Sequence, residues 1–115
     1  MTVKELTDTK KYRVVNLGDG QDRNIEKVFC CDLLSIAMGR APAGCAWVTV
    51  MGNMNTLAVA SLTDAACVIL AEGMELDEAA GKKAKEQGIT VLASEKPVFD
   101  TALEIYGMVS GEGIG

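Results

Sequence analysis

The 115-residue sequence contains no histidine, and this absence argues against several kinds of catalytic site at once. Histidine is the commonest general base in enzymes, the usual partner of a nucleophilic serine or cysteine, and a frequent zinc ligand. Composition leaves a lysine or serine nucleophile open, but no residue pattern pairs one with an activating group. We therefore expect a protein that is not an enzyme, with no catalytic residues and no cofactor.

Recognisable phosphate-binding loops are missing as well. The turn Gly18-Asp19-Gly20 begins like a dinucleotide loop, but Arg23 stands where G-x-G-x-x-G requires its third glycine. A near match to the P-loop around Gly81 fails because Lys83 replaces the required serine or threonine. Neither stretch predicts a nucleotide site, and the first is typical of a tight turn.

Metal-binding spacing is absent from the four cysteines. No C-x-x-C motif occurs, and adjacent residues on a strand point to opposite faces, so Cys30 and Cys31 are poorly placed to pair with each other. We interpret all four, which include Cys45 and Cys67, as free thiols in a reducing compartment with no metal bound. A redox role for Cys30 or Cys31 stays open, because one of the pair can face outward.

Aromatic residues are scarce at 4%, and the formal net charge is −5. The single basic cluster, around Lys82, is interleaved with glutamates on a predicted helix, which is not the clean positive patch that nucleic acids require. Apolar runs stay far below the ~20 residues that cross a membrane, and the first residues lack the apolar stretch of a signal peptide. We expect a cytoplasmic protein that binds neither nucleic acid nor membrane.

Hydrophobic patterning predicts strands that alternate with helices in one domain. The expected strands cover residues 12–17, 25–31, 47–51, 65–71 and 89–93, and the expected helices cover 2–9, 33–38, 56–62 and 77–87. Such alternation is typical of an α/β fold with a mixed or mostly parallel sheet flanked by helices.

A last helix is expected to open at Ser94, with Pro97 in its first turn, where proline is tolerated. One apolar face of this helix carries Phe99, Ala102, Leu103 and Tyr106. We expect the domain to end at residue 107 and a flexible glycine-rich tail to follow over residues 108–115.

The turn after the third strand, residues 51–56, is the best candidate for ligand binding. A helix that begins directly after a parallel strand offers free backbone N–H groups to an anion. Thr49 leads into this turn, Gly52 allows close approach, and Asn53 and Asn55 lie at the helix start. In the alternative interpretation, Asn53 or Asn55 only caps the helix.

A second candidate combines Asp22 and Arg23 with Asp32, which we also expect to cap the helix over residues 33–38. These three charged side chains form either a surface for a ligand or partner, or an exposed ion pair that contributes little to stability. Sequence alone leaves both interpretations open.

Three segments, residues 47–50, 55–64 and 67–73, carry a family resemblance that extends collinearly from about Lys11 to Met108. Over this stretch the chain resembles the DRTGG domain, a stand-alone relative of the N-terminal domain of HPr kinase/phosphorylase. Asp22-Arg23 and Asp32-Leu33-Leu34 stand where the family places its signature aspartate–arginine pair and its later Asp-Leu-Leu. Residues 26–28 depart from the family, which has threonine and glycines there.

The resemblance implies an α/β fold like the N-terminal domains of HPr kinase and of a peptidoglycan-precursor ligase, and a tendency to form homodimers. It implies no kinase activity, because the kinase carries its P-loop in a separate domain. The family's place between regulatory nucleotide-binding modules in some pyrophosphatases implies a non-catalytic regulatory or adaptor domain that acts through dimerisation and an unidentified protein partner. The alternative is a small-ligand sensor that binds a nucleotide or phosphorylated metabolite at residues 51–56.

Overall fold

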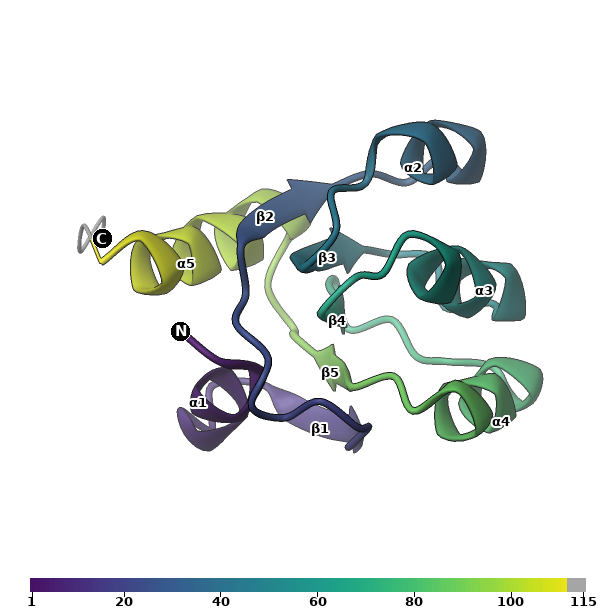
Figure 1. Ribbon diagram of the computed structural model, residues 1–115, viewed down its shortest axis with the longest axis horizontal. Coiled ribbons are helices and arrows are strands. Elements are labelled where there is room, and N and C mark those ends of the chain that lie inside the picture. The colour runs from purple at the N-terminus through teal and green to yellow at the C-terminus, as the bar shows by residue number, and fades with distance from the viewer. Residues whose placement is uncertain (112–115) are drawn as a thin grey trace.

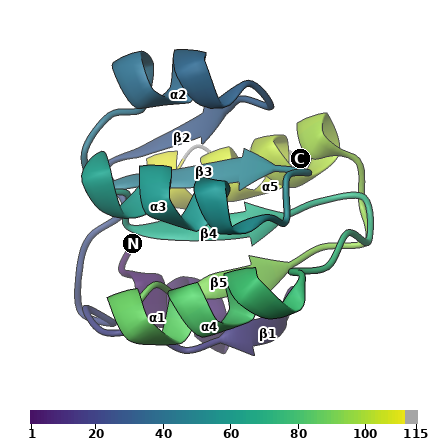
Figure 2. The same ribbon diagram turned by 90° about the vertical axis from the view of Figure 1, so that its right-hand side faces the viewer.

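A five-stranded sheet forms the middle layer of the molecule, and helices cover both of its faces (Figures 1 and 2). The computed structural model describes residues 1–111, which form a single α/β domain. Its elements follow in the order α1 (Val3–Asp8), β1 (Arg13–Asn16), β2 (Lys27–Cys30), α2 (Leu34–Arg40), β3 (Cys45–Thr49), α3 (Met54–Leu62), β4 (Cys67–Leu70), α4 (Glu78–Gln87), β5 (Val91–Ala93) and α5 (Val98–Ser110). The expected fold class is confirmed.

Four strands of the sheet run parallel, and the fifth runs antiparallel at one edge. The strand order is β1-β5-β4-β3-β2, and β2, β3, β4 and β5 are parallel neighbours. β1 pairs antiparallel with β5, with Arg13 opposite Ala93. Helices α2, α3 and α4 connect neighbouring parallel strands in turn. β2 forms the edge of the sheet opposite β1, and we call it the open edge.

Two apolar clusters lie on the two faces of the sheet, so strands β3 and β4 are buried along their whole length. Helices α1 and α5 cover one face, and α2, α3 and α4 cover the other (Figure 2). Alternate residues of β3 serve the two clusters: Val48 faces α5, whereas Trp47 packs under α3 and donates its indole N–H to the Cys31 carbonyl. Within residues 1–111, no helix is both long and apolar enough to cross a membrane.

The N-terminal caps of the first three helices agree with the sequence-based expectations only in part. Thr2 forms a capping box with Glu5 at α1, and Asn53 caps α3. The expected cap of α2 by Asp32 is wrong, because Leu33 is the N-cap residue and makes no side-chain hydrogen bond there. Asn55 lies inside α3, one residue past its start, and does not cap it.

The last helix, α5, begins later and ends later than the sequence predicts. Its N-cap residue is Pro97, because Ser94 lies in a preceding turn where its hydroxyl bonds to Thr101 and accepts from the Lys96 N–H. The helix continues through Ser110, and Gly111 ends it with a left-handed backbone. The first three residues of the expected tail are therefore helical, and residues 112–115 of that tail lie outside the described part of the chain.

Candidate functional site

Asp32 and Thr49 meet at the carboxyl edge of the sheet, where β2 and β3 end. Thr49 is fully buried, and its hydroxyl donates to Asp32 Oδ1 over 2.7 Å. The backbone N–H of Val50 donates to the same oxygen over 3.0 Å. Asp32 therefore satisfies two polar groups at the end of β3. This role explains why an aspartate stands here although it does not cap α2.

Gly52 and Asn53 shape the turn after β3 through contacts within the chain. A Cβ atom on Gly52 would lie 2.1 Å from the Glu75 carbonyl oxygen, so glycine lets two backbone segments approach closely. Asn53 Oδ1 accepts the Thr56 N–H over 3.0 Å, which satisfies one donor at the start of α3. Asn55 is exposed beside this turn. The interpretation of Asn53 as a helix cap accounts for its position.

Arg23 lies at the other end of the sheet from Asp32, because β2 separates them by four residues of strand, or roughly 13 Å. The expected grouping of Asp22, Arg23 and Asp32 is therefore corrected. Arg23 instead forms a two-pronged ion pair with Asp64, with Nη1–Oδ1 and Nη2–Oδ2 distances of 2.7 and 2.9 Å. These hydrogen bonds raise the pKa of Arg23 and lower the pKa of Asp64. Asp22 is exposed next to this pair.

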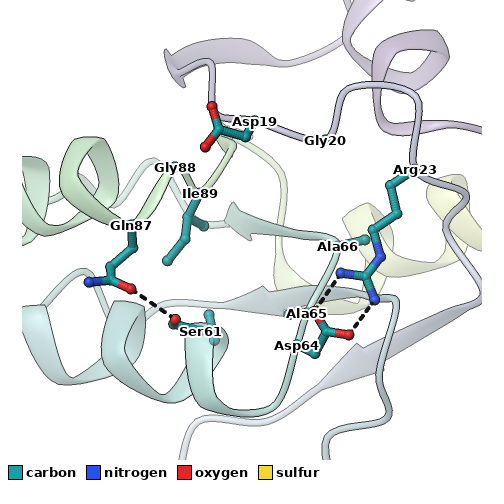
Figure 3. Close-up of a pocket in the computed structure, with 11 residues that line it drawn as sticks. Asp19, Gly20, Arg23, Ser61, Asp64, Ala65, Ala66, Gln87, Gly88 and Ile89 are labelled. Atoms are coloured by element: carbon teal, nitrogen blue, oxygen red, sulfur yellow. Dashed lines mark hydrogen bonds and ion pairs between the residues drawn. The ribbon is translucent and has the colours of Figure 1, made fainter.

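A polar hollow of about 220 Å³ opens beside the Arg23–Asp64 pair at the amino ends of β4 and β5 (Figure 3). Its walls come from the turn before Arg23, the carboxyl end of α3 with the loop that follows, and the carboxyl end of α4. Ser61 and Gln87 bridge the two helix ends with a hydrogen bond of 3.1 Å. The lining residues are Asp19, Gly20, Arg23, Ala60, Ser61, Asp64, Ala65, Ala66, Gln87, Gly88 and Ile89.

An apolar surface on α5 lies beside the open strand β2; we call it the α5 surface and define it as Phe99, Leu103 and Tyr106 with Val28 and Cys30. Phe99 is 70% exposed, and Leu103 and Tyr106 are 37% and 45% exposed. These residues, together with Ala102, line a groove of about 250 Å³ between α5 and β2. The predicted apolar face of the last helix is thus only partly covered by the sheet.

The cysteines fall into an accessible and an inaccessible group. Cys30 is exposed on β2, and Cys31 is half-buried with its thiol directed to the Leu33 carbonyl. Cys45 and Cys67 are buried, and burial raises their pKa to about 11 and about 12. No group of three or more metal-ligating side chains gathers anywhere within residues 1–111. Cys30 is therefore the accessible thiol on the α5 surface.

Sequence reasoning missed the hollow because its polar side chains come from three segments that are far apart in the sequence. Asp19, Asp64 and Gln87 were not among the candidate residues. Two signals pointed toward it: the glycine turn before Arg23, and the resemblance that covers both Arg23 and the segment ending at Asp64. Neither indicates that these segments meet, since the sheet order that brings them together is a property of the fold.

Comparison with known proteins establishes the class of fold. No protein-family model and no curated protein matches the chain. One similar solved structure is a regulatory region of CBS and DRTGG domains, with a TM-score of 0.64 and 14% identity over 86% of this chain. That structure is the regulatory region of Clostridium perfringens pyrophosphatase complexed with its activator, diadenosine tetraphosphate.

The chain spans 43% of the length of that pyrophosphatase region, so it corresponds to part of it. At 14% identity the likeness shows a shared α/β fold. The expected likeness to the N-terminal domain of HPr kinase stays a prediction.

Proposed function

We propose that this protein is a non-catalytic regulatory or adaptor domain that acts through dimerisation and through protein partners. The observation that carries the proposal is the α5 surface, which places Phe99, Leu103 and Tyr106 in solvent beside an open strand edge. Exposed apolar groups gathered in one patch are typical of surfaces that another protein covers. The occupant we propose is a second copy of this chain.

Phe99 is the most exposed aromatic side chain of the α5 surface and would be the anchor of the interface. An aromatic side chain presents roughly 200 Å² of surface, so Phe99, at 70% exposed, offers about 140 Å². At about 25 cal/mol per Å², burying it stabilises a complex by up to ~3.5 kcal/mol for each protomer. β2 forms an open edge of the sheet next to the patch, and its backbone groups are available to a strand of a second copy.

The context of the similar fold supports a regulatory role. The pyrophosphatase region is described as regulatory, and this chain has the fold of part of it. Within the described residues, no metal-ligand cluster supplies a catalytic centre. We place such a domain in the cytoplasm, where exposed Cys30 stays reduced.

The experiment compares two matched variants in sedimentation velocity at micromolar concentration. Phe99→Ser removes the centre of the α5 surface, whereas Leu62→Ser removes a side chain that is 71% exposed on α3, on the other face of the sheet. We expect the wild type and Leu62→Ser to sediment as dimers and Phe99→Ser as a monomer. A dimer that survives Phe99→Ser contradicts the proposed interface, and a monomeric wild type contradicts dimerisation.

A second candidate function is a small-ligand sensor for a nucleotide or phosphorylated metabolite at residues 51–56, with Thr49 and Asp32 at the same edge of the sheet. Its support is that the similar pyrophosphatase region was solved with diadenosine tetraphosphate. The start of α3 offers backbone N–H groups, and Asn55 is exposed beside them.

Thermal unfolding with a panel of nucleotides and sugar phosphates tests this sensor. A ligand at 100 times its dissociation constant adds about 2.7 kcal/mol to the free energy of unfolding. Asn55→Ala should abolish that gain and leave the unliganded protein's stability within about 0.5 kcal/mol, because Asn53 is the cap. The absence of any shift across the panel contradicts the sensor hypothesis.

A further inference from the structure

The polar hollow beside the Arg23–Asp64 pair lies apart from both surfaces discussed above. It opens at the amino ends of β4 and β5, whereas the turn at residues 51–56 lies at their carboxyl ends and the α5 surface lies along β2. Its volume of about 220 Å³ equals that of about seven water molecules in the liquid. The space suits a small metabolite of a few non-hydrogen atoms.

Arg23 is held in one position at the rim of this hollow. Both of its terminal nitrogens bond to Asp64, and Gly44 lies behind the guanidinium, where a Cβ atom would be 3.6 Å from Nη2. Asp64 adopts a left-handed backbone, which costs a non-glycine residue about 1 kcal/mol, and its carbonyl accepts the Gly44 N–H. The fold therefore fixes this ion pair, and three of the five Arg23 N–H donors stay available.

Asp19 supplies the second charged group of the hollow. Its backbone N–H donates to the Gly88 carbonyl over 2.9 Å, and its carboxylate lies directly over Gly88, where a Cβ atom would be 2.2 Å from Oδ2. Gly88 also has a left-handed backbone. Both this backbone and the close approach of Asp19 favour glycine at this position. Asp19 is exposed, and within residues 1–111 its carboxylate has no hydrogen-bond or ion-pair partner in the protein.

The charges in the hollow decide which ligand it suits. Asp19, Arg23 and Asp64 sum to −1, and Glu26 adds a further negative charge near the guanidinium. An anion would meet an arginine that is already neutralised, whereas a cation meets an unpaired carboxylate. A single free carboxylate is too few ligands for Ca²⁺ or Mg²⁺, which leaves an organic cation.

We propose that the hollow binds a small aliphatic ammonium compound that carries an oxygen acceptor, as amino alcohols and amino acids do. The ammonium group bonds to the Asp19 carboxylate, and the oxygen accepts from the N–H donors that Arg23 does not spend on Asp64. The short aliphatic part lies against the apolar lining, which consists of Ala60, Ala65, Ala66 and Ile89. This site is independent of the proposed dimerisation.

The experiment titrates the ¹⁵N-labelled protein with ethanolamine and L-alanine and follows its amide chemical shifts. Ethylene glycol and L-lactate are the matched controls, because in each a hydroxyl replaces the ammonium group. We expect saturable shifts at Gly20, Ala66 and Gly88 with at least one ammonium probe and none with its control. Asp19→Asn should weaken that binding at least about tenfold, or ~1.4 kcal/mol, while Glu86→Gln, an equal charge change outside the hollow, leaves it unchanged.

Four results would overturn the proposal. They are equal shifts with the hydroxyl controls, shifts that map away from the hollow, unchanged affinity in Asp19→Asn, and the absence of a saturable shift with either ammonium probe. A well-dispersed amide spectrum of Asp19→Asn shows that this variant is folded, and Arg23→Lys, which keeps the charge but loses the two-pronged pair, then tests the second contact independently.

Discussion

Replacing Asp32 by alanine should destabilise the fold by about 2 kcal/mol, because it leaves two donors at the end of β3 without a partner. One is the hydroxyl of Thr49, which is fully buried, and the other is the N–H of Val50. A hydrogen bond to a charged acceptor contributes about 1.5–3 kcal/mol, and the exposed side of Asp32 reduces the sum of two such bonds.

Urea unfolding at one fixed protein concentration measures this effect, since the proposed dimerisation would make stability depend on concentration. With a slope of about 1–1.5 kcal/mol per molar urea, a loss of ~2 kcal/mol lowers the midpoint by roughly 1.3–2 M. Asp22→Ala is the control, because this aspartate is exposed and makes no side-chain hydrogen bond within residues 1–111. It should stay within about 0.5 kcal/mol of the wild type.

A double-mutant cycle with Thr49→Val separates the hydrogen bond from general damage. Thr49→Val removes the buried donor, so Asp32→Ala should cost about 1 kcal/mol less in that background. Additive effects of the two substitutions, or a loss below about 0.5 kcal/mol for Asp32→Ala, would refute the structural role assigned to Asp32.

Three further predictions follow from single contacts. Gly52→Ala should cost more than about 2 kcal/mol in urea unfolding, because the new methyl group collides with the Glu75 carbonyl; a neutral effect contradicts the close approach. The hydrogen bond from Lys96 holds the pKa of Glu104 below its ordinary value of 4.5. The ion pair therefore stabilises the fold above pH 4.5, and this stabilisation is lost as the pH falls through the folded-state pKa of Glu104. Glu104→Gln should therefore make the urea midpoint less dependent on pH as the pH falls below about 4.5, and an unchanged pH dependence argues against this ion pair. In native thiol labelling counted by mass spectrometry, Cys30 should react while the two buried cysteines do not, and equal labelling contradicts their burial.

Local sequence signals predict much of this fold. Alternating apolar stretches predict the order of the strands and helices, and Gly88 marks the end of α4 because its left-handed backbone favours glycine. The α/β class follows from that alternation alone. The cap at Asn53 was one of two open alternatives, and spacing could not choose between Asn53 and Asn55.

Tertiary contacts explain the errors. Asp32 has the residue type and place of a helix cap, but the buried Thr49 hydroxyl on the neighbouring strand takes its carboxylate instead. The apolar face of α5 has the helical period of a core helix, and periodicity cannot tell that Phe99 and Tyr106 extend past the edge of the sheet. Arg23 and Asp64 are 41 residues apart, and a parallel sheet order is needed to bring them together.

Sedimentation equilibrium of the wild-type protein over a range of micromolar concentrations tests the central claim most directly. The chain has a mass of 12.1 kDa. We expect a single species of twice that mass, which dissociates when Phe99→Ser removes the centre of the α5 surface. A strict monomer at every concentration would contradict the proposal that the protein acts as a dimer through this surface.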